Sequence, residues 1–460
     1  MKDNHTLPPG PKALPFFGNL LEFQRDQLAY LERMQRSYGP MVTVHMGNRP
    51  FIMLFEPEYI RYILTENPRS FTPTQTRGGD LMEVLGEGLL TIEGEAHRQQ
   101  RRLVQPAFHK KRVEGYADTM VQYTLEMLDN WHAGAQLDIA HEMQQLTLRI
   151  VARSLFALEL IDQVQELGKQ FTRMTEHRRG VFARLLNVYL DLPFTGYGKR
   201  MAAKRKIDAF VYQLIAQRRA SGRDEGDALS MLLAAQDEAS QLTDSQVRDN
   251  VLTLLAAGHE TTANALNWTF YLLSQNPGPR DKLLAELQTV LAGRAPTIND
   301  LPNLPYTEWV INETMRFYPP VWMIGRVSLT DIDLGGYHFP TGTVFMLSQW
   351  ILHRHPAIWG DPAVFRPERW DPELGQKVPG WSYFPFGGGP RICIGMPFAQ
   401  LEAKLLLATI LQRYTPRLVP GFQVQLKPRV TLRPKHGLRM ILEPSSTPVK
   451  TAEAQPSSIG

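Results

Sequence analysis

The stretch Phe386-Gly-Gly-Gly-Pro-Arg391-Ile-Cys393-Ile-Gly395 contains the only cysteine among the 460 residues of the chain. A lone thiol can form neither an intramolecular disulfide nor a multi-cysteine metal site. Cys393 is therefore an inert buried residue, a nucleophile or a single thiolate ligand. The surrounding glycines let backbone N–H groups approach the sulfur, the helix expected after Gly395 presents its positive end, and Arg391 adds a cation. The stretch predicts a sulfur that stays ionised.

Five positions of this stretch, Phe386, Gly389, Arg391, Cys393 and Gly395, match the F-x-x-G-x-R-x-C-x-G haem-binding loop of the cytochrome P450 monooxygenases. The chain resembles this family. The resemblance implies a mainly α fold with small β-sheets, a helix-rich body plus a β-rich subdomain, and haem b with Cys393 as its axial thiolate. It also implies that Phe386 packs beside the sulfur and that Arg391 pairs with a haem propionate. The alternative is a free cysteine near a glycine-rich turn. No His/Asn partner arrangement for a cysteine hydrolase is recognisable around Cys393.

A second motif, Ala257-Gly-His-Glu-Thr-Thr262, lies inside the helical run 247–273. Gly258 weakens a helix by ~1 kcal/mol relative to alanine, so a local reason for it is expected. Thr261 and Thr262 are also poor helix formers, and a threonine hydroxyl can bond to the carbonyl four residues earlier. Together these residues predict a helix that is locally opened beside a ligand.

This motif resembles the A/G-G-x-D/E-T-T/S segment of the same family, where a helix crosses the distal face of the haem. The resemblance implies that Thr261 donates a hydrogen bond to bound oxygen and that Glu260 relays protons from solvent. Cleaving the O–O bond requires two protons at the distal oxygen without flooding the site. The alternative is that Glu260 is a surface carboxylate and Thr261 a core hydroxyl. His259 is not assigned as a ligand.

Two further segments resemble the family's structural elements. Glu313 and Arg316 are spaced i, i+3 and share a helix face. The segment Phe365-Arg-Pro-Glu-Arg369 follows, with Trp370 where the family usually has Phe. The resemblance implies that Glu313, Arg316 and Arg369 form a buried ion-pair triad for folding and haem retention. Stranding one of its charges typically costs ~3–5 kcal/mol.

Charge-assisted bonds to arginine are natural anchors for the two haem propionates. By motif position the candidates are His97 and Arg101, in Gly94-Glu-Ala-His-Arg-Gln-Gln-Arg101, together with Arg326 and Arg391. The family often has Trp where this chain has His97. The alternative for each arginine is an exposed surface position.

The composition, 43% hydrophobic and 21% charged with a net charge of +4, is that of a large globular enzyme. No apolar run approaches the ~18–20 residues that span a bilayer; the longest are 251–258 and 405–411. The polar start, 1–5, lacks a secretory apolar segment. One cysteine and no export signal predict a cytoplasmic location. The basic run 109–112 has no nucleic-acid motif around it.

We expect one domain. Residues 1–18 are a proline-rich lead-in, 19–443 a single haem domain and 444–460 a disordered tail. A hairpin is predicted at 41–45 and 51–55, helices from about 57 to 298, and strands at 332–345 and 423–442.

The distal pocket should be lined by Leu90, Phe182, Ala257, Val321 and Ile324. These side chains are largely apolar, which favours a hydrophobic substrate such as a fatty acid, terpenoid or steroid. The alternative is that they are ordinary core residues.

The resemblance implies O2-dependent hydroxylation or epoxidation of a hydrophobic small molecule. Two electrons must come from a separate donor, since no flavin or iron–sulfur module is recognisable in the chain. A ferredoxin or flavodoxin with its reductase is expected to dock near Cys393, with Arg98, Arg102 and Lys110 as contacts. The alternatives are a haem-thiolate peroxygenase or isomerase of the same fold and a non-catalytic haem sensor. No nucleic acid partner and no membrane span are expected.

Overall fold

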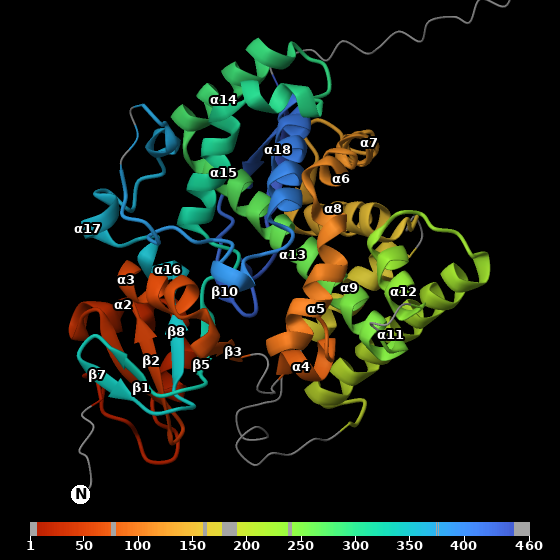
Figure 1. The fold of residues 1–460 in the computed structure, drawn as a ribbon. Helices are drawn as coiled ribbons and strands as arrows, with labels where there is room; N and C mark the ends of the chain where they lie inside the picture. Colours follow the sequence, from red (N-terminus) through yellow and green to blue (C-terminus); the bar gives the residue numbers. More distant parts are fainter. Residues whose placement is uncertain are drawn as a thin grey trace, which may run out of the picture.

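The computed structural model describes residues 7–74, 80–159, 163–176, 191–237, 242–373, 375 and 377–445. Figure 1 shows a helix-rich body with a small sheet beside it, as the sequence predicted. The α-helices of the described residues are α1 (Leu20–Arg25), α2 (Gln27–Tyr38), α3 (Pro57–Arg61), α4 (Asp80–Leu85), α5 (Gly94–Val104), α6 (Lys110–Glu114), α7 (Ala117–Leu128), α8 (Ile139–Phe156), α9 (Val164–Glu176), α11 (Gly196–Ser221), α12 (Ala228–Asp237), α13 (Asp244–Gln275), α14 (Pro277–Leu291), α15 (Pro305–Phe317), α16 (Gln349–Leu352), α17 (Pro356–Trp359) and α18 (Met396–Arg413).

The strands form four small sheets. They are β1 (Met41–Met46), β2 (Arg49–Leu54), β3 (Phe71–Pro73), β4 (Gln136–Asp138), β5 (Ile324–Ser328), β6 (Ile332–Leu334), β7 (Tyr337–Phe339), β8 (Val344–Leu347), β9 (Tyr414–Leu418), β10 (Leu426–Pro428), β11 (Leu432–Pro434) and β12 (Arg439–Pro444). The five-stranded sheet has the order β1-β2-β8-β5-β3; β4-β12-β9, β10-β11 and β6-β7 form the others.

The predicted hairpin is present, because β1 pairs antiparallel with β2 from Met41↔Leu54 to Met46↔Arg49. Gly47 has a φ of 65°, which suits the tight turn between them. The sequence prediction missed β5, which pairs with both β8 and β3. This strand has five residues and four consecutive buried positions, so it lacks the alternation that marks a half-buried strand.

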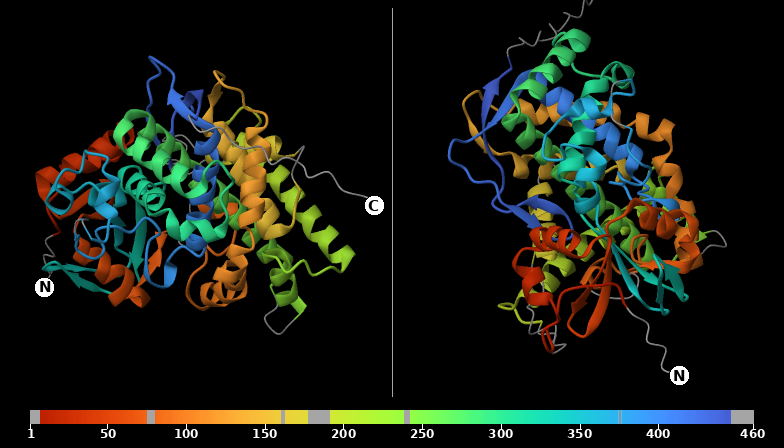
Figure 2. Two further views of the ribbon diagram at one scale, coloured as in Figure 1. Left: turned by 90° about the horizontal axis from the view of Figure 1, so that it is seen from above. Right: turned by 90° about the vertical axis from the view of Figure 1, so that its left-hand side faces the viewer.

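Helix α13 runs through the centre of the body and packs on α8, α15 and α18. Its start is fixed by a capping box, in which Thr243 and Gln246 satisfy each other's backbone N–H groups. Leu266, Trp268 and Phe270 on this helix are at most 1% exposed. Figure 2 shows the red-to-orange and teal strands of the five-stranded sheet at one end of the helical body.

Strand β12 extends to Pro444, one residue into the segment predicted to be a disordered tail. The part of that segment after Ser445 and the first six residues of the lead-in lie outside the described residues. Within the rest of the lead-in, Leu14 and Gly18 form a β-bridge, and Gly18 also bridges to Met46.

Candidate active site

Cys393 lies between a short 3-10 turn at Gly389–Arg391 and the start of α18. Its N–H donates to the Phe386 carbonyl at 3.0 Å, which closes the loop. Gly389 is required here, because it has a φ of 63° and a Cβ would lie 1.8 Å from the Leu64 carbonyl oxygen. The loop is thus packed tightly against the turn that contains Leu64 and holds the sulfur at a fixed place.

The electrostatic surroundings of this sulfur differ from the prediction. Backbone N–H groups of Gly395 and Met396 bond to it and lower its pKa, as expected, but burial is the larger effect and raises the pKa of the Cys393 thiol. The cation that acts on the sulfur is Arg101, not Arg391, whose Nη2 donates to the Ile92 carbonyl at 2.7 Å. The Cys393 side chain is nevertheless exposed at the surface of the loop, where it is accessible to a metal ion, and a bound metal ion deprotonates a cysteine ligand.

The second motif lies on α13, where Thr261 Oγ1 donates to the Ala257 carbonyl at 2.7 Å. The helix is α-helical without interruption from Asp244 to Gln275, so the predicted local opening is wrong. The threonine hydroxyl satisfies a carbonyl of its own helix instead. The glycine at position 258 is explained by close helix packing instead, because a Cβ at this position would lie 2.7 Å from Val151 Cγ2 on α8.

Glu260 is mostly buried and faces the start of β11. Thr431 Oγ1 donates to Glu260 Oε1 at 2.5 Å, and Arg433 Nη1 lies 3.9 Å from the same oxygen. Glu260 is thus not a surface carboxylate. Sequence reasoning missed Thr431 and Arg433, because nothing in the local pattern links residues 171 positions apart.

The four predicted propionate partners come together from three elements. Burial lowers the pKa of Arg326, on β5, and of Arg391 to about 10 each, and the two guanidinium groups repel each other. Burial and the charges of Arg391, Arg101 and Arg98 lower the pKa of His97 to about 3, so this imidazole is neutral. His97 and Arg101 both lie on α5.

These cations have few anionic partners. Arg101 Nη1 donates to the Ile392 carbonyl at 2.8 Å, and Arg326 Nη1 to the carbonyl of Gly325 at 3.0 Å. Glu93 is near enough to raise the pKa of Arg391, but within the described residues no carboxylate forms an ion pair with any of the three arginines. Arg326 is buried and Arg101 and Arg391 are partly buried, so these cations require an anionic partner, and the two propionates of haem meet that requirement.

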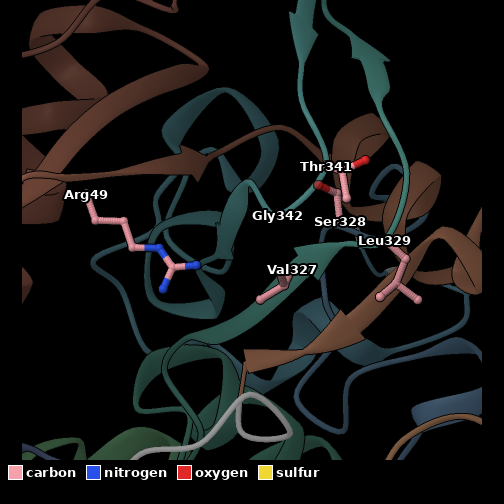
Figure 3. A pocket seen from close by; sticks show the side chains of 6 residues that line it. All are labelled: Arg49, Val327, Ser328, Leu329, Thr341 and Gly342. Atoms are coloured by element: carbon pink, nitrogen blue, oxygen red, sulfur yellow. The ribbon is translucent and has the colours of Figure 1, made fainter.

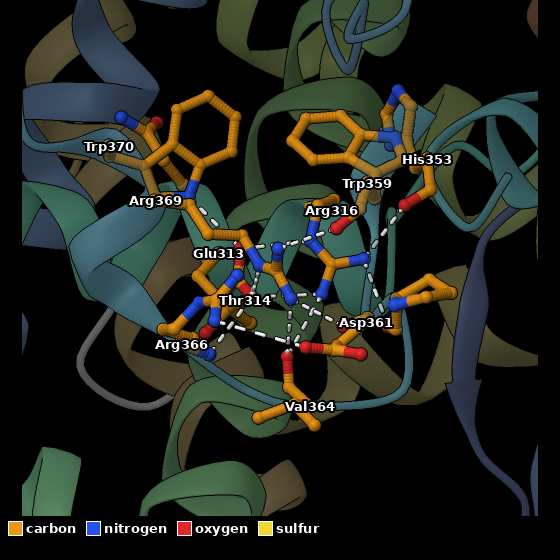
Figure 4. A network of polar contacts seen from close by, with 12 residues as sticks. Glu313, Thr314, Arg316, His353, Trp359, Asp361, Val364, Arg366, Arg369 and Trp370 are labelled. Atoms are coloured by element: carbon orange, nitrogen blue, oxygen red, sulfur yellow. Dashed lines mark hydrogen bonds and ion pairs between the residues drawn. The ribbon is translucent and has the colours of Figure 1, made fainter. Parts of the chain in front are cut away.

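The predicted triad is an ion-paired cluster (Figure 4). Glu313 receives two bonds from Arg316, at 2.8 and 2.9 Å, and one from Arg369 Nε at 3.2 Å. The Trp370 indole N–H also donates to Glu313, at 3.1 Å, which a phenylalanine at this position could not do. All three charged side chains are at most 1% exposed. The Arg366 N–H adds a further bond to this carboxylate.

The structure describes four of the five residues predicted to line the substrate pocket. Phe182 lies outside the described residues. Ala257 is exposed on α13, Leu90 is 39% exposed, and Val321 and Ile324 are half-buried. The hollow in Figure 3 has a volume of about 280 Å³ and lies at the ends of strands β2 and β5. No predicted site residue lines it; its lining residues are Arg49, Val327, Ser328, Leu329, Thr341 and Gly342.

A cysteine on a glycine-rich loop, a threonine-bearing helix and a cluster of buried cations define a haem-thiolate protein. The chain belongs to the cytochrome P450 family, whose model matches residues 8–441. The fold, the haem cofactor with cysteine ligation and the enzyme class predicted from the sequence are thereby confirmed. The protein is a monooxygenase that inserts one atom of O2 into a hydrophobic small molecule with electrons from a separate redox partner.

Three relatives from Streptomyces are similar over nearly their whole length, and the names of two of them describe the oxygenation of a terpenoid. The chain is 37% identical to cyclooctatin synthase of Streptomyces melanosporofaciens, over 96% of each chain. It is 35% identical to cyclooctat-9-en-7-ol 5-monooxygenase of the same organism, over 90% of this chain and 91% of that protein. It is 32% identical to pentalenene oxygenase of Streptomyces avermitilis, over 95% and 98%.

A solved structure has the same fold. It is the retinoic acid-bound cyanobacterial CYP120A1, with a TM-score of 0.84 and 28% identity over 96% of this chain and 100% of that chain. Within the described residues, no helix combines the length and the apolar character that crossing a membrane requires. The expected cytoplasmic location stays a prediction.

Proposed function

We propose that the protein hydroxylates or epoxidises a cyclic terpenoid. The observation that carries this proposal is the near full-length similarity, at 32–35% identity, to relatives whose names describe the oxygenation of cyclooctat-9-en-7-ol and pentalenene. The accessible apolar side chains of Ala257 and Leu90 are consistent with such a substrate.

In the reaction, one oxygen atom of O2 enters the substrate and the other leaves as water, with two electrons from the donor and two protons from solvent. Bound haem supplies the centre at which O2 is activated, with Cys393 as the electron-donating ligand. Glu260 takes up protons and Thr261 holds one near the oxygen. The single domain at residues 19–443 encloses these groups.

Arg101, Arg326, Arg391 and His97 bind the propionates. The three arginines contribute charge, and the neutral imidazole contributes one N–H. Phe386, Gly389 and Gly395 shape the loop around the sulfur. Glu313, Arg316 and Arg369 have no contact with the reacting atoms and maintain the segment that supports the loop.

The electron donor is an acidic ferredoxin or flavodoxin. Arg98 and Arg102 lie one turn apart on the exposed face of α5, and Lys110 is exposed at the start of α6. Arg98 is paired with Glu95, Nη2 to Oε2 at 2.5 Å, and Lys110 with Glu114, Nζ to Oε1 at 3.8 Å, so Arg102 contributes most of the attraction. The same helix carries the partly buried Arg101, which acts on the sulfur.

The substrate class is tested with purified haem-loaded protein and four probes: cyclooctat-9-en-7-ol, pentalenene, retinoic acid and palmitate. We expect the two cyclic terpenoids to shift the Soret band to shorter wavelength on binding and to be oxidised when ferredoxin, reductase and NADPH are supplied. Ala257→Phe should weaken this binding, whereas the same change at the exposed Ala96 on α5 should not. Binding and oxidation of palmitate alone would overturn the proposal.

A further inference from the structure

The carboxylate of Glu260 is held by two residues from a distant part of the chain. Thr431 donates to Glu260 Oε1 at 2.5 Å, and the guanidinium group of Arg433 lies 3.9 Å from that oxygen. Thr431 directly precedes β11, and Arg433 lies within it. The side chains of Glu260 and Arg433 are 13% and 7% exposed, so salt screens their attraction less than that of a surface pair.

The hydroxyl of Thr431 has a defined direction. Asn264 Nδ2 donates to Thr431 Oγ1 at 3.2 Å. Because the amide occupies a lone pair of this oxygen, the single hydroxyl hydrogen is left to point at Glu260. Asn264 is fully buried and follows Glu260 by one helical turn, so the two side chains share a face of α13. Thr431 therefore links two side chains of the helix to β11.

The start of β11 is itself fixed in place. The Trp268 indole N–H donates to the Leu432 carbonyl at 2.9 Å, and the Leu432 N–H donates to the Pro320 carbonyl at 2.8 Å. Trp268 lies one further turn along the same face of α13. Thr431 is thus attached to a segment that cannot shift without breaking backbone hydrogen bonds.

Glu260 and Thr261 are directed to different partners. Thr261 Oγ1 donates to the Ala257 carbonyl on its own helix, while Glu260 accepts from Thr431. Successive helical residues point about 100° apart, and no hydrogen bond joins these two side chains in the part of the chain that the structure describes. For a proton to pass between them, the Glu260 side chain has to turn away from β11 or act through water.

We propose that Thr431 and Arg433 are positioning residues that hold Glu260 in a resting position on β11 and so control proton supply to Thr261. The inference rests on the proposed role of Glu260 as the proton relay. We call the hydrogen bond from Thr431 and the attraction of Arg433 the tether of Glu260. Glu260 delivers a proton only when the tether breaks, which limits the number of protons that reach the site. The rate of opening, set by β11, then limits O2 consumption.

The test uses haem-loaded protein with ferredoxin, reductase and NADPH, and measures oxygen uptake in H2O and D2O without an organic probe. Thr431→Val should raise oxygen uptake by roughly tenfold, the population change that loss of one hydrogen bond to a carboxylate produces, and should reduce the solvent isotope effect. Thr431→Ser should restore wild-type values. Thr409→Val is the matched control, because Thr409 is a buried threonine on α18 that bonds to the Leu405 carbonyl.

Combining Thr431→Val with Glu260→Gln distinguishes failure of the relay role of Glu260 from failure of the Thr431 tether. This variant should slow oxygen uptake, and Thr431→Val should have no further effect in its background. If Glu260→Gln leaves the uptake and isotope effect of the wild type unchanged, the relay role fails, and the inference fails with it. If Glu260→Gln slows uptake but Thr431→Val matches the wild type, the relay stands and the tether is refuted.

A double-mutant cycle on urea-induced unfolding tests the tether without turnover. Thr431→Val should raise the unfolding equilibrium constant in both backgrounds. The factor should be roughly ten times larger in the wild type than in Glu260→Gln, because a hydrogen bond to a carboxylate is lost only in the wild type. Equal effects in the two backgrounds would overturn the inference. With cyclooctat-9-en-7-ol as the probe, loosening the tether should also raise the share of oxygen released as peroxide. Failure of the wild type to oxidise this probe would affect only the proposed substrate class.

Discussion

Replacing Glu402 with Gln should stabilise the protein, and the gain should grow as the pH rises. Glu402 lies on α18 with no exposed surface, and neither carboxyl oxygen has a well-aligned hydrogen bond to the described residues. Burial raises the pKa of Glu402 from its ordinary value of 4.5 to about 8, and the nearby Thr262 hydroxyl acts in the opposite direction. At neutral pH this carboxyl is therefore protonated in the folded protein and ionised in the unfolded chain.

The magnitude follows from the linkage between proton binding and folding. Above the unfolded pKa of about 4.5 the folded state holds one proton more than the unfolded state, so stability falls as the pH rises. The fall is ~1.4 kcal/mol per pH unit until the folded pKa of about 8 is reached. Glutamine does not titrate, so the stability of Glu402→Gln relative to the wild type should increase by roughly 2.5 kcal/mol between pH 6 and pH 8.

The assay is urea-induced unfolding of both haem-loaded proteins at pH 6, 7 and 8, followed by far-ultraviolet circular dichroism. Glu373→Gln is the matched control, because it makes the same chemical change at an exposed position. If the difference in unfolding free energy between Glu402→Gln and the wild type stays constant from pH 6 to pH 8, the carboxyl of Glu402 is not protonated in the folded protein and the reasoning is refuted. As an independent check, the infrared band of a protonated carboxylic acid should be present in the wild type at pH 7 and absent from Glu402→Gln.

Three further predictions concern the buried charges and the donor surface. Glu313→Gln should lower the free energy of unfolding in urea by ~3–5 kcal/mol, because it strands two buried arginines, whereas Glu22→Gln at an exposed ion pair should cost less than about 1 kcal/mol. Arg326→Leu should speed the transfer of haem to apomyoglobin by about tenfold through the loss of one charge-assisted bond, and an unchanged rate would contradict its role as a propionate partner. Charge reversal at Arg102 and Lys110 should slow reduction by ferredoxin at low ionic strength and have less effect in 0.5 M salt; equal slowing at both ionic strengths would argue against an electrostatic contact.

The sequence predicted the features that depend on short spacings. The loop from Phe386 to Gly395 is contiguous, so its residue types alone identify the cysteine and the turn that presents it. The hairpin of β1 and β2 is likewise local, with Gly47 marking the turn. Glu313 and Arg316 share a helix face by spacing, and the structure pairs them at 2.8 Å.

The predictions that failed depend on surroundings distant in sequence. The cation that acts on the sulfur of Cys393 is Arg101 on α5, a helix distant in sequence, and not the neighbouring Arg391. The helix around Thr261 looked strained because Gly258 is a poor helix former, yet this glycine is explained by close packing against Val151 on α8. The partner of Glu260 is Thr431, and a separation of 171 positions leaves no pattern that local periodicity could detect.

Burial also links cofactor binding to the stability of the fold. Arg326 and Arg391 are held where their charged forms are disfavoured, and the thiol of Cys393 is held where its ionised form is disfavoured. Each of these costs is offset when propionates pair with the arginines and iron binds the sulfur. A ligand that binds only the folded state stabilises it by mass action, so variants that remove these charges should lose haem affinity more than they lose stability of the haem-free chain. Arg326→Leu should therefore narrow the difference in urea midpoint between the haem-loaded and haem-free proteins. In the haem-free protein the substitution removes an unfavourable buried charge, whereas in the haem-loaded protein it removes the partner of a propionate.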